Sequence, residues 1–152
     1  PEHLTLWCED EPIVIAGDQI ISSISPNLGV YATEPEADPV QEWLMSCEAF
    51  LPFSNDKQLV LPGHKLPFYG LPHRLKQLIE NHHSALKRLV AFLKEPQTAV
   101  DCFPVLFNRK ISDNEYGLAL VEAVAHLNHL YRKKIVKREL NSKGAYVYTL
   151  KN

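Results

Sequence analysis

The sequence has few cysteines, no long apolar run and no excess of basic charge. Its three cysteines, Cys8, Cys47 and Cys102, form no paired metal-binding motif, and each lies among apolar neighbours. We therefore expect reduced, buried thiols and a cytoplasmic protein. No apolar stretch approaches the ~20 residues that a membrane-spanning helix needs, and no charged-then-apolar signal segment opens the chain. These features argue against a membrane partner.

The charge is nearly balanced over the whole chain but differs between its two ends. The formal net charge is -2 over 152 residues, which by itself indicates neither nucleic acid nor an anionic membrane as a partner. Residues 97–152 carry a balance of +4, and the preceding residues carry a balance of -6. This asymmetry predicts two domains, which we place at residues 1–95 and 96–152.

Alternating and helical patterns predict a mixed α+β fold. Two short strands around a charged turn indicate a hairpin, and a non-periodic stretch rich in proline follows as a long surface loop. Apolar residues at helical spacing then predict two long helices on either side of a short buried strand. The expected elements are strands His3–Trp7 and Ile13–Ala16, loop Ser22–Pro39, a helix from Asp38–Pro39 to Leu51, strand Leu59–Leu61 and helix Leu71–Leu93.

A different pattern begins in the carboxyl-terminal third of the chain. The segment Thr98–Phe107 is expected to be a helix capped by Thr98, and Tyr116–Tyr131 is strongly helical. Two alternating strands, Ile135–Leu140 and Ala145–Leu150, close the chain. Helices followed by a terminal hairpin predict a small winged-helix subdomain.

Two polar residues follow predicted strands. Asp18 comes after Gly17 at the end of one strand, and His64 comes after a Pro-Gly turn at the end of another. A carboxylate and a neutral imidazole are ligand types that zinc, iron or manganese accept. Each residue alone also fits a simpler role, Asp18 in a turn and His64 as a loop cap. We predict that the two side chains converge on one cleft, within the ~4–5 Å that shared metal coordination allows.

Several segments together resemble a known superfamily. Pro1–Leu6, Ile15–Asp18 and Leu61–His64, in this order and spacing, resemble the second half of metallo-β-lactamase superfamily hydrolases. Ser25–Val30, the long helix with Arg74, His82 and His83, and the closing helices and hairpin are similar to one branch, which includes glyoxalase II-like thioesterases and an endoribonuclease-like group. The resemblance implies the carboxyl-terminal half of a metallo-β-lactamase αβ/βα sandwich, followed by a winged-helix subdomain.

The resemblance implies roles for only two residues. Asp18 matches the carboxylate that bridges two divalent transition metal ions, and His64 matches the last histidine ligand, so both are expected as catalytic and metal-binding residues. Zinc is the expected metal, with iron and manganese as alternatives. The H-x-H-x-D-H motif that supplies further ligands in this family does not occur in the sequence. We therefore expect a fragment that lacks the amino-terminal half of the hydrolase domain, binds metal poorly or not at all, and is inactive alone.

The implied reaction is hydrolysis of a thioester or ester of a small acyl substrate by metal-activated water. An RNA phosphodiester is the second candidate, and a winged-helix nucleic-acid-binding module without catalysis is the third. Against nucleic acid, the helix Tyr116–Tyr131 offers few side chains suited to phosphate contact. The basic residues that follow it, Arg132, Lys133 and Lys134, also complement the helix dipole. We expect this subdomain to pack on the hydrolase half or on a second subunit of a homodimer.

The remaining histidines are expected to be structural. His82 lies on the apolar stripe of its helix and is predicted to be buried, whereas His73 and His83 are predicted to face solvent. His126 lies four residues after Glu122, which predicts a pair on the helix surface.

Two further polar residues belong to the segments that carry the resemblance. His3 matches a family position that is not a metal ligand, so we expect it to be structural or to support the ligands. Arg74 lies at a helix start from which it can reach an anionic substrate, although a solvated arginine is the preferred interpretation.

Overall fold

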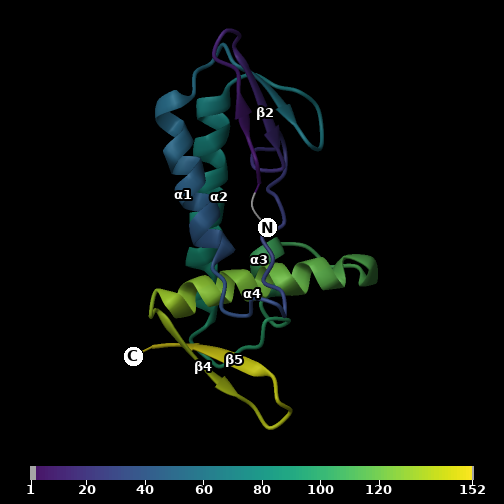
Figure 1. Cartoon of the computed structure of the whole chain (residues 1–152). Helices are drawn as coiled ribbons and strands as arrows, with labels where there is room; N and C mark the ends of the chain where they lie inside the picture. Colours follow the sequence, from purple (N-terminus) through teal and green to yellow (C-terminus); the bar gives the residue numbers. More distant parts are fainter. Residues whose placement is uncertain (1–2, 152) are drawn as a thin grey trace. The chain divides into compact units, whose positions relative to one another are not determined.

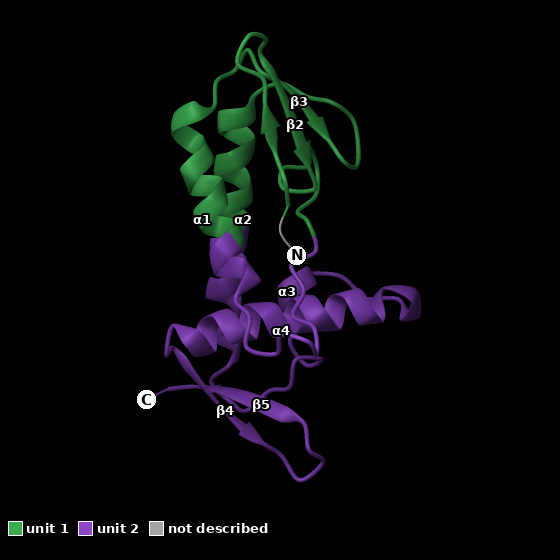
Figure 2. Cartoon of the chain, viewed as in Figure 1, with its two compact units in different colours: residues 1–26, 43–81 green, residues 27–42, 82–152 purple. Residues whose placement is uncertain are grey.

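A computed structural model of the chain describes residues 3–151 and shows a mixed α+β fold (Figure 1). Two compact units divide it: residues 1–26 and 43–81 form unit 1, and residues 27–42 and 82–152 form unit 2 (Figure 2). The domain boundary expected between residues 95 and 96 stays a prediction. Pro1 and Glu2, which open the first segment of the family resemblance, lie outside the described residues.

The sheet of unit 1 has three strands in the order β1-β2-β3: β1 (Leu6–Trp7), β2 (Ile13–Gly17) and β3 (Leu59–Pro62). The first two strands are antiparallel, which confirms the predicted hairpin, although β1 is shorter than expected. β2 and β3 are parallel. Because parallel strands point the same way, the carboxyl ends of β2 and β3 lie at the same edge of the sheet.

The two faces of this sheet differ in what covers them. Val14, Ala16 and Val60 point to a buried face, where each is fully excluded from solvent. Parts of α1 (Pro39–Phe50) and α2 (Leu71–Phe92) lie beside the sheet in unit 1 (Figure 2). The leucines that predicted the second helix, Leu71, Leu75 and Leu78, are buried as expected.

The opposite face of the sheet is open. Leu6 and Ile15 are paired across β1 and β2, and their exposed fractions are 53% and 48%. Both faces of the sheet therefore carry apolar side chains, a pattern typical of sheets that are covered on both sides, although one face is exposed here.

The proline-rich stretch that follows β2 is a loop, as predicted. Within the described residues, positions 18–38 contain no helix or strand. The loop ends where α1 begins at Pro39, and the Asp38 carboxylate accepts a hydrogen bond of 3.0 Å from the Gln41 backbone N–H. Asp38 therefore caps the helix, as its sequence position indicates. A short 3-10 helix, η1 (Leu51–Phe53), follows α1.

Unit 2 contains the carboxyl-terminal elements. They are α3 (Phe103–Phe107), the 3-10 helix η2 (Asp113–Glu115), α4 (Tyr116–Arg132), and the antiparallel strands β4 (Val136–Leu140) and β5 (Tyr146–Leu150). The helix predicted over Tyr116–Tyr131 and the closing hairpin are confirmed. Gln97 and Tyr148 exchange backbone hydrogen bonds of 3.0 and 2.8 Å, which join the chain after α2 to β5.

Two sequence predictions are wrong in this description. The helix expected over Thr98–Phe107 begins only at Phe103, because the Thr98 backbone N–H and hydroxyl both donate to the Asp101 carboxylate and close a turn instead. Cys8 is exposed, since it follows β1 at the charged hairpin turn. Cys47 and Cys102 are free and buried as expected, and burial raises the pKa of each thiol to about 12. Among the described residues, no helix has the length and apolar character to cross a membrane.

Candidate functional site

Asp18 lies directly after β2, where the backbone turns sharply. Gly17 adopts a left-handed conformation with φ of 51°, which favours glycine, and a Cβ there would lie 3.3 Å from the Leu4 carbonyl oxygen. The Gln19 N–H then donates to the Ala16 carbonyl over 3.1 Å. The turn places the Asp18 side chain at the carboxyl edge of the sheet.

His64 lies at the same edge, two residues after β3. The parallel register pairs Ile15 with Leu61 and then Gly17 with Pro62, so β2 carries a local irregularity at its end. Beyond the last pair, the Gly63 N–H donates to the Gly17 carbonyl over 2.7 Å. Backbone hydrogen bonding therefore holds the two strand ends together up to the residues that precede Asp18 and His64.

The predicted proximity of Asp18 and His64 is confirmed. Nδ1 of His64 lies 2.6 Å from Oδ1 of Asp18, and the side chains are 68% and 38% exposed, respectively. Since a carboxylate only accepts, this hydrogen bond requires a proton on Nδ1. Nε2 of His64 and Oδ2 of Asp18 are then the atoms that the pair can offer to a metal ion.

The two side chains are suitable ligands for a transition metal, but two ligands are fewer than a catalytic metal site needs. An imidazole nitrogen and a carboxylate oxygen are ordinary zinc ligands, and an N–H that a carboxylate holds fixes the orientation of a ligand histidine. A catalytic zinc needs about three protein ligands. Among residues 3–151, no group of three or more His, Cys, Asp or Glu side chains is placed to hold a metal ion. The role of Asp18 and His64 as ligands therefore stays a prediction.

Arg74 is not the solvated arginine that the sequence favoured. It is 9% exposed, its Nε donates to the Ile21 carbonyl over 2.7 Å, and its Nη2 donates to the Ile24 carbonyl over 2.9 Å. The guanidinium thus holds the loop that follows Asp18. The sequence contains the signal for burial, because position 74 lies between Leu71 and Leu78 on the apolar stripe of α2.

His3 is half-buried in the part of unit 1 that leads into β1. Its Nδ1 atom is buried and has no hydrogen-bond partner among the described residues. A role in supporting the ligands stays a prediction for this residue.

His126 of unit 2 is more deeply buried than the sequence indicated. His126 is only 2% exposed, so the predicted surface pair with Glu122 is wrong; its Nδ1 donates to the Glu122 backbone carbonyl over 2.9 Å. Burial lowers the pKa of His126 to about 4. Its ring stacks on the buried ring of His82, with 5.6 Å between centroids. The predictions of a buried His82 and exposed His73 and His83 are confirmed.

Sequence reasoning missed a second carboxylate–imidazole pair. Nδ1 of His129 lies 3.0 Å from Oδ1 of Asp38, and both side chains are at most 10% exposed. Burial by itself raises the pKa of Asp38, but hydrogen bonds from His129 and the Gln41 N–H lower it overall. The sequence around Asp38 indicates only a helix start, because the partner His129 is 91 residues away.

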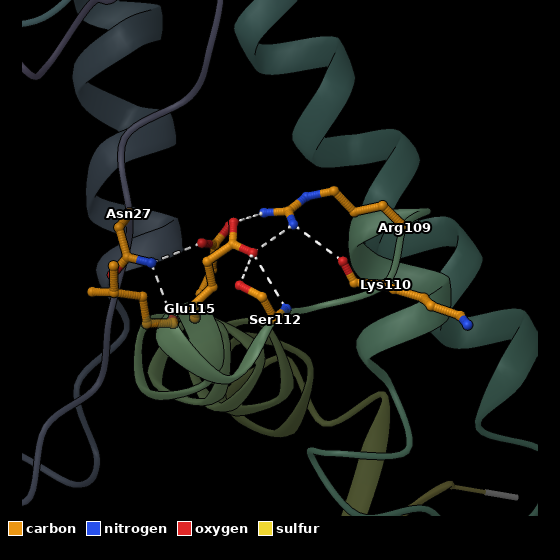
Figure 3. Close-up of polar contacts among 7 residues, drawn as sticks. Asn27, Arg109, Lys110, Ser112 and Glu115 are labelled. Carbon is orange, nitrogen blue, oxygen red and sulfur yellow. Dashed lines mark hydrogen bonds and ion pairs between the residues drawn. The ribbon is translucent and has the colours of Figure 1, made fainter.

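The loop segment 27–38 is joined to α4 at several points. The Asn27 side-chain amide donates to the Leu118 carbonyl over 3.1 Å and to the Glu122 carboxylate over 2.9 Å (Figure 3). Burial raises the pKa of Glu122 to about 7, and the bond from Asn27 partly offsets this effect. The Asn128 amide donates to the Pro35 and Ala37 carbonyls over 2.8 and 3.3 Å. These hydrogen bonds join this part of the loop to α4 within unit 2.

A second polar group stabilises η2, the short helix that leads into α4. Arg109 donates to both oxygens of the Glu115 carboxylate over 2.6 and 3.0 Å, and Glu115 also accepts from the Ser112 hydroxyl and N–H (Figure 3). Ser112 and Glu115 form a capping box. We assign these residues a structural role. They belong to unit 2, whereas Asp18 belongs to unit 1.

Comparison with known proteins gives two kinds of similarity. Residues 86–151 match the family described as metallo-beta-lactamase-like, C-terminal domain. The chain is similar to the crystal structure of a beta-lactamase domain protein from Burkholderia ambifaria, with 33% identity and a TM-score of 0.94, over 99% of this chain and 44% of that one. It is also similar to a metallo-beta-lactamase family protein from Thermus thermophilus, with 27% identity and a TM-score of 0.81, over 97% of this chain and 44% of that one.

No curated protein matches the sequence. The chain spans less than half the length of each of the two similar structures. Its mixed α+β fold therefore matches part of the metallo-beta-lactamase fold, and residues 86–151 are similar to the C-terminal domain that the matching family describes.

Proposed function

We propose that this chain, which carries a metallo-beta-lactamase-like C-terminal domain at residues 86–151, is part of a binuclear metal-dependent hydrolase. The observation that carries the proposal is the 2.6 Å contact between Asp18 and His64 at the ends of two neighbouring parallel strands. Two candidate ligands from separate segments meet there, and both side chains remain open to solvent. The contact supports the proposal because it brings an imidazole and a carboxylate, both common metal ligands, to the same edge of the sheet.

The residues of the chain have defined tasks in this proposal. His64 offers Nε2 and is oriented by its Nδ1 hydrogen bond to Asp18, while Asp18 keeps Oδ2 available. Metal ions, zinc first among them, supply a water of lowered pKa and stabilise developing negative charge when bound. Arg74 contributes indirectly, because it holds the backbone that follows Asp18.

The proposal needs ligands from outside these residues. The two similar structures are more than twice as long as this chain, and the exposed apolar face around Leu6 and Ile15 needs a cover. We infer that the amino-terminal half of the hydrolase domain packs on this face and supplies the remaining ligands. The chain alone is then expected to bind metal poorly and to be inactive.

A thioester or ester of a small acyl compound is the proposed substrate. The segment that follows His64 exposes Leu66 and Tyr69, at 78% and 64%, next to a single charged residue, Lys65. Exposed apolar side chains favour an acyl group over a polyanion such as RNA, whose backbone needs several cationic contacts. An RNA phosphodiester is the second candidate substrate.

The test uses the complete natural protein, as its gene encodes it. Asp18→Ala and His64→Ala should each lower hydrolysis of a thioester reporter by at least ~100-fold, because each removes a ligand of the centre. Exposed residues of the same types, Asp56 and His73, provide the matched controls Asp56→Ala and His73→Ala, which should hydrolyse at the unaltered rate. Cleavage of an RNA oligonucleotide but of no ester by the unaltered protein would select the second substrate class.

The carboxyl-terminal subdomain is proposed as a winged helix that serves packing and assembly. In support, α4 carries the buried residues Ala123, Leu127 and Leu130, and a hairpin follows it. Its closing Arg132 binds the Glu36 carbonyl over 3.0 Å, so part of the basic cluster already has a structural partner. Titration with random and defined duplexes at two salt concentrations tests this proposal: weak, salt-sensitive binding is expected, whereas tight, sequence-dependent binding would contradict it.

A further inference from the structure

We propose that Gly63 is a positioning residue that sets the distance between Asp18 and His64. The inference rests on the proposed function for its importance, but its geometry stands on contacts within unit 1. A Cβ atom at position 63 would lie 2.7 Å from Oδ1 of Asp18 and 3.2 Å from the backbone carbonyl carbon of Gly17. A methyl group therefore cannot occupy this place while the Asp18 carboxylate stays where it is.

The Asp18 oxygen that a Cβ at position 63 would approach is also the oxygen that contacts His64. Oδ1 of Asp18 is the oxygen that lies 2.6 Å from Nδ1 of His64. An alanine at position 63 would thus displace this oxygen first, because a carboxylate at the end of a side chain moves more easily than a backbone carbonyl. The contact with His64 is the interaction that is lost when the carboxylate turns away.

The backbone of Gly63 does not by itself require glycine. The glycines with positive φ are Gly17, Gly70 and Gly144, so position 63 has a conformation that alanine also adopts. Its N–H donates to the Gly17 carbonyl over 2.7 Å, and alanine keeps that donor. The reason for glycine at this position is therefore the space that Asp18 occupies, and the predicted effect of alanine falls on the site more than on the fold.

The experiment compares Gly63→Ala with Gly117→Ala in the complete natural protein. Gly117 is a matched control because a Cβ there meets no atom within 4 Å and its φ is not positive. The first measurement is the tautomer of His64 in the metal-free protein, from long-range proton–nitrogen NMR spectra of the imidazole. Unaltered protein and Gly117→Ala should show the proton on Nδ1, and Gly63→Ala should lose this preference, as should Asp18→Ala.

The second measurement is the zinc affinity, from competition with a chelator. Gly63→Ala should weaken zinc binding at least ~10-fold, the effect typical of residues that orient a ligand, while Gly117→Ala binds as the unaltered protein does. Unaltered zinc affinity together with an unaltered tautomer in Gly63→Ala would overturn the inference. If Asp18→Ala keeps its zinc while Gly63→Ala still shifts the tautomer, the proposed function fails and the positioning role stands.

A double variant keeps the inference testable if Gly63→Ala unfolds easily. In Asp18→Ala/Gly63→Ala the carboxylate is gone, so the second substitution should cost almost no stability in that background. A loss of stability that persists without the Asp18 carboxylate would place the obstacle in the Gly17 backbone, and it would refute the assignment.

Discussion

Two carboxylate–imidazole pairs of similar geometry lie in the two units of this chain, and they differ in their surroundings. Asp18 and His64 of unit 1 meet at 2.6 Å with side chains 38% and 68% exposed. Asp38 and His129 of unit 2 meet at 3.0 Å with side chains 10% and 8% exposed. The same pair of chemical groups is thus open to a ligand in one unit and closed in the other.

The neighbours of each pair explain what it can do. Asp38 also accepts from the Gln41 N–H and lies 3.9 Å from Arg132, so its oxygens are engaged in holding the start of α1 and the end of α4. Asp18 lies at a strand edge, next to a glycine that leaves it room. Burial and saturation of hydrogen bonds make the Asp38 pair a structural element, and exposure makes the Asp18 pair available for chemistry.

The largest effect expected from this comparison is on stability. Asp38→Ala leaves His129 buried without its partner and removes a helix cap, so it should lower the free energy of unfolding by about 3–5 kcal/mol. Asp18→Ala in metal-free protein should change it by less than about 0.5 kcal/mol, because an exposed pair contributes little. Urea unfolding of both variants measures the two values, and equal losses would remove the distinction between the pairs.

A second prediction concerns the pH dependence of the buried region. His126 has its pKa lowered to about 4, from an ordinary value of 6.5, so the unfolded chain takes up a proton at a higher pH than the folded chain. The contribution of His126 to the free energy of unfolding is therefore fully present above pH 6.5. It falls by about 3 kcal/mol as the pH decreases from 6.5 towards 4.

Two phenylalanine variants isolate this contribution. His126→Phe should reduce the loss of stability between pH 7 and pH 4, while His83→Phe, at an exposed position of α2, should leave it unchanged. Glu122, with a pKa raised to about 7, contributes a pH dependence of opposite sign, so each variant is compared with the unaltered chain at the same pH. Identical pH profiles for all three proteins would show that the imidazole of His126 is accessible to protons.

The sequence predicts most of the fold because its strongest signals are local. Leucines at helical spacing predicted α2, alternation predicted the terminal hairpin, and the Asp38-Pro39 pair predicted the start of α1. The convergence of Asp18 and His64 was also predictable, since both follow short buried strands and parallel strands end at one edge.

The errors arise where a polar residue takes its partner from a distant segment. Arg74 binds carbonyls of Ile21 and Ile24, and His129 binds Asp38, contacts that no local pattern contains. The prediction for His126 is wrong because helical spacing identifies a neighbour, Glu122, but does not show that this side of α4 is buried. At Thr98, a hydrogen bond to Asp101 stabilises a turn in place of the expected helix start.

A smaller effect is expected where the loop meets α4. Asn128 is 1% exposed and donates to the Pro35 and Ala37 carbonyls, so Asn128→Ala should lower the free energy of unfolding by about 2 kcal/mol, because it removes a buried donor that makes both hydrogen bonds. Asn27 is exposed, and Asn27→Ala should cost about 0.5 kcal/mol, because water replaces its bonds. Thermal unfolding of the two variants compares their stabilities. A larger loss of stability in Asn27→Ala than in Asn128→Ala would show that exposure does not determine how much these hydrogen bonds contribute.

Zinc content per folded chain tests the distinction between the two pairs most directly. In the complete natural protein, Asp18→Ala should lose bound zinc while its metal-free unfolding midpoint stays unchanged. Asp38→Ala should unfold at a lower temperature but keep its zinc in measurements below that temperature. Full zinc content in Asp18→Ala, or loss of zinc from folded Asp38→Ala, would contradict the assignment of chemistry to the exposed pair and of stability to the buried one.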